Sequence, residues 1–211
     1  MWKQMFSMEN PVMQALGVAC DLLLLNLLGA VCCLPVLTAG PALAALAGTS
    51  LLLVRGEEEG VVRTYFRVFR GSLKKGVALG LLFLAAGTVL AVDYRAAGAF
   101  PSLARLLRLP VLTAALLLLS AALWAFPLLA RYEAGLGRTL QNALRMAVGF
   151  FPQTLKMLAF TLGLWLVCLR FFTQALPVLL LFGLSLPAYV CALLIDKPFR
   201  AIEQEAEEEL Q

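Results

Sequence analysis

The chain contains no histidine and few charged residues, which excludes several common kinds of active site. Without histidine, neither a Ser-His-Asp triad nor an HExxH zinc site can be built. No CxxC pair is present, and the five cysteines all fall within apolar stretches, where we interpret them as packing residues. A GxxxxGK(S/T) phosphate loop is also absent. We therefore expect a protein that is not an enzyme, with no catalytic residues, no cofactor and no metal site.

Charged residues make up only 14% of the chain and hydrophobic residues 62%, whereas about a quarter of a typical soluble domain is charged. The charges are clustered, and the runs between them approach the roughly 20 apolar residues that cross a bilayer as a helix. The net charge of +4 comes from segments between these runs, where the loops of a membrane protein belong. We therefore predict the lipid bilayer, and not nucleic acid, as a partner of this chain.

Six apolar runs predict an all-α, polytopic transmembrane bundle. They are Met13–Leu34, Thr38–Val54, Gly76–Val92, Pro110–Leu129, Leu155–Phe172 and Ala175–Ile195. The second and third runs are the shortest, with 17 residues each. Residues 1–211 are expected to form a single membrane domain, and residues 196–211 an acidic cytoplasmic tail.

The distribution of lysine and arginine predicts the orientation of this bundle. Thirteen of the 17 basic residues fall at the N-terminus, in the loops after the second and fourth runs, or in the tail. The other four lie on the opposite side. Because cytoplasmic loops carry the excess of positive charge, both termini are expected in the cytoplasm, with the chain in the cytoplasmic (inner) membrane.

The loop after the second run has the pattern of an amphipathic surface helix. Arg63, Arg67, Arg70 and Lys74 recur at helical spacing and would form one basic stripe against the inner leaflet. Residues 138–151, after the fourth run, predict a second helix of this kind. The order of span, surface helix and span would then occur twice, as a weak internal repeat. The alternative to an internal repeat is that the two loops resemble each other only because both are basic cytoplasmic loops.

The uncharged segment from Pro35 to Pro41 must turn the chain between the first two runs. Thr38 is placed to cap the next helix, and Pro41 suits its first turn. Gly40 begins a series of small residues spaced by four, which permits close helix packing. Two interpretations stay open: a tightly packed hairpin, or a re-entrant turn that lines a cavity.

Asp21 is the most informative polar residue because it lies within the first apolar run, where a carboxylate is costly. The predicted orientation gives Lys156, Arg131 and Lys74 as its candidate cationic partners. Three interpretations stay open: a structural ion pair, a site that couples protons or cations to transport, and a protonated, neutral carboxyl group.

The stretch from Asn26 to Pro41 resembles the signature of the YesL-like family of small bacterial membrane proteins, whose function is unknown. The resemblance continues through Arg55-Gly56-Glu57 and the basic aromatic segment 65–70. Gly29 departs from the family pattern, which often has a bulky aromatic residue there. The resemblance implies a membrane protein that accompanies carbohydrate uptake systems, and it supplies no site residues.

Two functions from different classes follow as hypotheses. The first is a non-enzymatic accessory or regulatory protein of a carbohydrate uptake system, with a transporter permease or a sensor kinase as its partner. The second is a small-solute transporter or channel that acts as a homodimer or other oligomer. The second rests on the uncharged turn, on Asp21 and on the kinks expected at Pro177 and Pro187.

Overall fold

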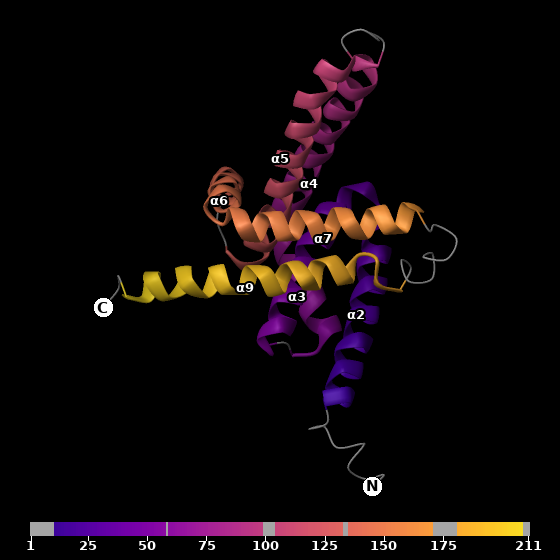
Figure 1. The fold of residues 1–211 in the computed structure, drawn as a ribbon. Coiled ribbons are helices and arrows are strands. Elements are labelled where there is room, and N and C mark those ends of the chain that lie inside the picture. The colour runs from indigo at the N-terminus through magenta and orange to yellow at the C-terminus, as the bar shows by residue number, and fades with distance from the viewer. Residues whose placement is uncertain (1–10, 58, 99–103, 133–134, 171–180, 209–211) are drawn as a thin grey trace.

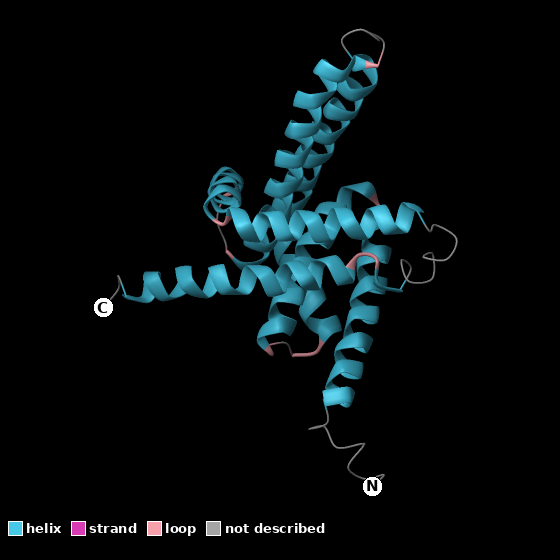
Figure 2. Ribbon diagram, in the orientation of Figure 1, coloured by secondary structure: helices cyan, strands magenta, loops and turns pink. Residues whose placement is uncertain are grey.

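The computed structural model describes residues 11–57, 59–98, 104–132, 135–170 and 181–208, and its regular structure there is entirely helical (Figures 1 and 2). The predicted all-α class is therefore confirmed for the described part of the chain. In chain order the elements are α2 (Pro11–Cys33), the short 3-10 helix η1 (Val36–Thr38), α3 (Ala39–Arg55), α4 (Val61–Ala97), α5 (Ala104–Arg131), α6 (Leu136–Gly149), α7 (Phe151–Arg170) and α9 (Ser185–Glu208).

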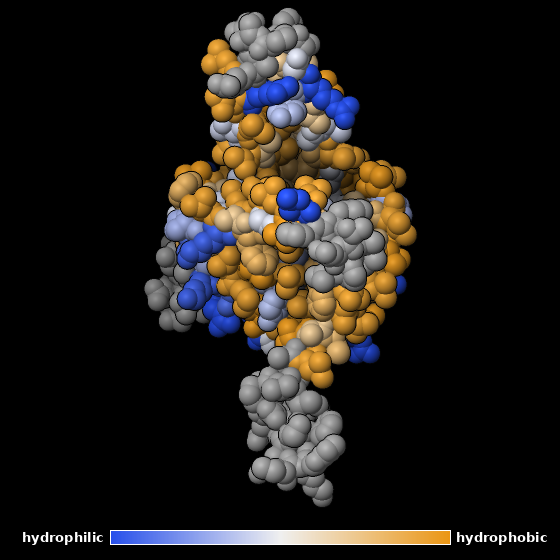
Figure 3. Space-filling view, turned by 45° about the vertical axis from the view of Figure 1, so that its right-hand side comes forward, coloured by the Kyte–Doolittle hydropathy of each residue, from blue (hydrophilic) through white to orange (hydrophobic). Residues whose placement is uncertain are grey.

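Five of these helical segments are long and apolar enough to cross a membrane: α2, α3 together with η1, α4, α5 and α7. Their outer faces carry large apolar side chains that water would solvate poorly. Leu27 on α2 is 62% exposed, and on α7 Leu169 is 69% and Leu166 65% exposed. Hydrophobic residues also dominate the face shown in Figure 3. Such extensive apolar surface is unusual for a soluble monomer and supports a multi-pass membrane protein.

Helix α4 differs from the expectation of a surface helix followed by a separate span. It runs without interruption through 37 residues, a length of about 55 Å at 1.5 Å per residue. No proline interrupts this stretch, and Gly76 lies against α3 instead of breaking the helix. The corresponding segment after α5 is broken, because Phe150 leaves the helical region at φ −105° and ψ 47° between α6 and α7.

The end of the chain also differs from expectation. Part of the predicted sixth span, including Pro177, lies outside the described residues. Helix α9 begins at Ser185 and continues to Glu208, so most of the expected tail extends the last helix instead of forming a separate segment. Pro187 stands in the first turn of α9 and so begins a helix there. The kink expected at Pro187 is therefore wrong.

Helix α3 is the centre of the fold. It contacts α2, α4, α5 and α9, and 61% of its most apolar stretch is buried, against 22% for α2 and 11% for α4. Its sequence is rich in alanine, glycine and other small residues, which lets several helices approach its backbone closely. Helices α7 and α9 contact each other and run across the long α4–α5 hairpin (Figure 1).

Candidate functional site

A buried ion pair joins the end of α3 to the middle of α9. The Nε of Arg55 donates a hydrogen bond to Oδ1 of Asp196 at 2.7 Å, and the two side chains are only 4% and 14% exposed. One turn further along α9, the Nε of Arg200 donates to the other carboxylate oxygen, Oδ2, at 2.8 Å. Both oxygens of Asp196 are thus engaged, which fixes the carboxylate between the two guanidinium groups.

The charge state of Asp196 follows from these contacts. Burial alone would raise the pKa of its carboxyl group, since it disfavours the charged form. Hydrogen bonds from Arg200 and Arg55, together with their positive charges, outweigh burial and hold the pKa below its ordinary value. Asp196 is therefore ionised at neutral pH, and the cluster carries two positive charges and one negative charge.

The local sequence explains why Arg55 occupies this position. Helix α3 ends at Arg55 because Gly56 adopts a left-handed conformation, with φ 68°, and its N–H bonds back to Leu52 and Leu53. A cation in the last turn also complements the negative end of the helix dipole. Gly60, with φ 92°, then redirects the chain into α4.

Two further ion pairs connect the α3–α4 loop to its neighbours. Glu57 lies 3.9 Å from Arg131 at the end of α5, and Glu59 pairs with Arg67 on α4. These side chains are between 34% and 67% exposed, so each pair adds little stability on its own. Together with the Arg55–Asp196 pair, these contacts connect four elements: the end of α3, the end of α5, the first half of α4 and the middle of α9.

The predicted basic stripe is present on the first half of α4. Arg63, Arg67, Arg70 and Lys74 are all exposed, whereas Tyr65, in the same stretch, is completely buried. Phe66 lies beside the stripe and is 39% exposed. Val62, which the sequence pattern places on the apolar face, is also exposed, and the segment continues directly into the apolar half of α4, so a separate amphipathic surface helix stays a prediction.

The three residues of the candidate intramembrane site lie on three different helices. Asp21 is half-buried on α2, which packs against α3, α4 and α9. Arg131 ends α5 beside Glu57, and Lys156 is exposed near the start of α7. The pairing of Asp21 with either cation stays a prediction.

The turn between the first two predicted spans is packed against α4. The Thr38 hydroxyl lies 2.7 Å from the carbonyl oxygen of Cys32 and 2.9 Å from that of Pro35, so it can donate back into the turn and makes no side-chain cap on α3. Gly40 and Pro41 are buried. A Cβ added at Gly40 would collide with the carbonyl oxygen of Gly76, so only glycine fits. These contacts favour the tightly packed hairpin.

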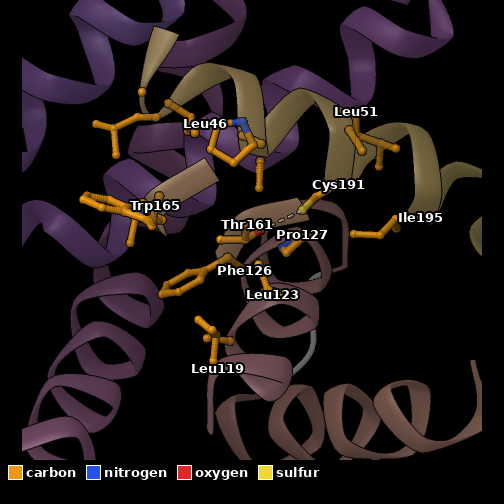
Figure 4. Close-up of a pocket in the computed structure, with 18 residues that line it drawn as sticks. Leu46, Leu51, Leu119, Leu123, Phe126, Pro127, Thr161, Trp165, Cys191 and Ile195 are labelled. Atoms are coloured by element: carbon orange, nitrogen blue, oxygen red, sulfur yellow. Dashed lines mark hydrogen bonds between the residues drawn. The ribbon is translucent and has the colours of Figure 1, made fainter. Parts of the chain in front are cut away.

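Sequence reasoning missed an apolar cavity of about 340 Å³ between α3, α5, α7 and α9 (Figure 4). Leu46, Phe126 and Trp165 line it, among other apolar residues. Its few polar groups include the Thr161 hydroxyl, which lies 4.0 Å from the Cys191 thiol. The residues that form the cavity are far apart in the sequence and each appears as an ordinary span residue, so no local pattern indicated it.

A family model described as "Protein of unknown function, DUF624" matches residues 22–94. The match covers the second part of α2, all of α3 and most of α4, including Arg55 and the basic stripe. It agrees with the resemblance seen in residues 26–70, although the matching model does not bear the YesL name. No curated protein and no solved structure matches the chain.

Proposed function

We propose that this chain is a non-enzymatic integral membrane protein that acts as an accessory or regulatory subunit of a membrane-bound partner. The Arg55–Asp196–Arg200 cluster carries the proposal. Both carboxylate oxygens are engaged by arginines of the same chain, so the cluster serves as a brace between α3 and α9. The exposed basic stripe on α4 and the amphipathic helix α6 then remain as surfaces for contact.

We further propose six transmembrane helices and cytoplasmic termini in the inner membrane. Residues 175–195 would supply the sixth span in addition to the five apolar helices. The orientation rests on the positive-inside rule, since Arg55, Arg131 and the basic stripe belong to the more basic side of the chain. Helix α6 would lie at the inner leaflet on that side, and residues 61–75 would extend the third span beyond the membrane on the same side, because α4 is continuous.

The proposed partner is a transporter permease or a sensor kinase of a carbohydrate uptake system. The link to carbohydrate uptake rests on the family resemblance alone, whereas the physical support for a partner is the exposed stripe with Phe66 beside it. Aromatic and arginine side chains in one patch are the residues that most often anchor protein interfaces. A crosslinked pull-down of the tagged protein from its native membrane tests this proposal. Stoichiometric recovery of such a partner supports it, and recovery of the chain alone contradicts it.

The second candidate function is transport by an oligomer of this chain, and the cavity between α3, α5, α7 and α9 favours an apolar solute for it. A sugar needs several hydrogen-bonding partners, whereas the walls of this cavity are almost entirely apolar. Flux measurements on proteoliposomes that contain only the purified chain separate the two functions. Uptake that Asp21→Asn abolishes without loss of folding would favour transport, and a change in stability alone would favour the accessory role.

A further inference from the structure

A groove of about 500 Å³ lies between α4 and α5, away from the Arg55–Asp196 brace. One face of each helix forms its walls, with Phe83, Gly87 and Leu90 on α4 and Leu112 and Ala115 on α5. Tyr94 and Arg95 are the polar residues among those that line it, and both stand near the end of α4. The groove is therefore apolar along its length and polar at one end.

A second arginine lies beside the polar end of this groove and contacts Tyr94 there, although it is not one of the residues that line the groove. The guanidinium carbon of Arg108, on α5, lies 5.1 Å from the centre of the Tyr94 ring, in a cation–π contact. The Nε of Arg108 is buried and has no hydrogen-bond partner among the described residues. Asp93, which directly precedes Tyr94 in the sequence, is exposed on α4. A buried donor without a partner is costly, and an anion at this position would satisfy it.

We propose that this groove binds one anionic phospholipid, with an acyl chain between α4 and α5 and the phosphate beside Arg95 and Arg108. An amphiphile fits because the polar groups are confined to one end. Arginine binds phosphate well through its planar set of donors. In Figure 3, hydrophilic residues gather near the end of the α4–α5 hairpin, above a hydrophobic surface.

The length of the groove supports a lipid. Tyr94 stands eleven positions after Phe83 along α4, which corresponds to roughly 16 Å at 1.5 Å per residue. One leaflet of a bilayer contributes about half of a hydrocarbon core that is about 30 Å thick. The apolar part of the groove therefore matches the depth of one leaflet, with the arginines at the level of its headgroups. This assignment does not depend on whether the protein acts as an accessory subunit or as a transporter.

Native mass spectrometry of the full-length protein in detergent tests the proposal, with phosphatidylglycerol and phosphatidylcholine of identical acyl chains added at equal concentration. The wild type should retain phosphatidylglycerol about tenfold more strongly. Both lipids carry a phosphodiester, but the choline cation of phosphatidylcholine neutralises its headgroup and is repelled by the two arginines. Arg108→Gln should remove that preference. The matched control Arg70→Gln removes one exposed arginine from the basic stripe and should leave the preference unchanged.

Gly87→Leu tests the apolar part of the site independently. A Cβ at Gly87 meets no atom within 4 Å, so the leucine side chain can enter the groove without disturbing the backbone and should lower the retention of lipid. Gly71→Leu is the control, because Gly71 is equally open and lies outside the groove. If Arg108→Gln does not fold, Arg95→Gln takes its place.

Three results would overturn the proposal. Equal retention of the two lipids would mean that the groove holds only ordinary annular lipid. Equal loss in Arg70→Gln and Arg108→Gln would mean that the overall charge of the protein selects the lipid. Unchanged retention in Gly87→Leu would mean that the acyl chain does not occupy the groove.

Discussion

Arg55 and Asp196 are separated by 141 positions in the sequence, and their side chains meet at 2.7 Å between Nε and Oδ1. The contact joins the helix at the centre of the fold to the last helix of the chain. Both side chains are largely shielded from water, so neither charge is well solvated if the other is removed. The contact therefore predicts both the cost of removing Arg55 and the dependence of stability on the ionisation of Asp196.

Removal of Arg55 should strongly destabilise the protein. Loss of one member of a buried ion pair costs about 3–5 kcal/mol when the other charge is left unpaired. Arg55→Met leaves the Asp196 carboxylate with Arg200 as a remaining partner, so the cost should fall at or below the lower end of this range. The free energy of unfolding, measured by denaturant titration in detergent, reports the change. Arg67→Met is the matched control, because the Arg67–Glu59 pair is exposed and should cost less than about 1 kcal/mol. The double variant Arg55→Met, Asp196→Leu should recover much of the loss, and equal effects of the two single arginine variants would contradict the brace.

The stability of the protein should depend on Asp196 at acid pH. The pKa of this carboxyl group is lower in the folded chain than its ordinary value of 3.8. Its contribution to the free energy of unfolding is therefore fully present above about pH 4 and is lost as the pH falls through the lowered folded-state pKa. Arg200→Gln removes one of the groups that lower this pKa, so its melting temperature should fall less steeply on acidification. An unchanged slope in both Arg200→Gln and Asp196→Asn would contradict this assignment.

Close packing of α3 against α4 should tolerate no side chain at Gly40. A Cβ there collides with the backbone of Gly76 and lies 2.9 Å from the Cα of Gly80, so Gly40→Ala should lower the melting temperature and separate the two helices. The control is Gly71→Ala, which meets no atom within 4 Å. It should be neutral or stabilising by about 0.5–1 kcal/mol, because alanine is the better helix former. Thermal unfolding in detergent, followed by circular dichroism, measures both, and a tolerated Gly40→Ala would favour an open, re-entrant turn.

The orientation of the protein should be visible by cysteine labelling. In a variant whose five native cysteines are replaced by alanine, a cysteine at Lys74 should react with a membrane-impermeant maleimide only after the cytoplasmic side is opened. A cysteine at Arg95 should react in intact cells. Both side chains emerge from the same helix, α4, in the structure. Labelling of both positions from one side would contradict the proposed topology.

The agreement between sequence and structure is closest where the information is local. The first predicted span, Met13–Leu34, corresponds to α2 at Pro11–Cys33, and the second corresponds to α3. Hydrophobic runs set these helices because backbone polar groups in lipid must bond within their own segment. The continuity of α4 was not predicted, because the change from a polar to an apolar composition near Gly76 resembles a boundary even though no residue there breaks the helix.

The brace was not predicted because it depends on tertiary packing. The sequence places Arg55 among the basic residues that orient the chain, in a segment that also carries the family resemblance, and it places Asp196 at the start of the acidic tail. A signal was nevertheless present, since Asp196 is an isolated acid directly after an apolar run and Arg200 follows it at a spacing of four. The cavity and the groove likewise depend on how apolar helix faces are spaced, which no hydropathy pattern records.

Crosslinking from the basic stripe most directly tests the central claim that this protein acts through a partner. A photoreactive amino acid replaces Phe66, which is exposed beside the stripe, and in a matched variant replaces Leu116, which is 45% exposed on α5. After irradiation of native membranes, the account predicts a stoichiometric adduct with a transporter permease or sensor kinase from position 66, and only lipid adducts from position 116. Adducts with lipid alone, or only with a second copy of this chain, at both positions would contradict it.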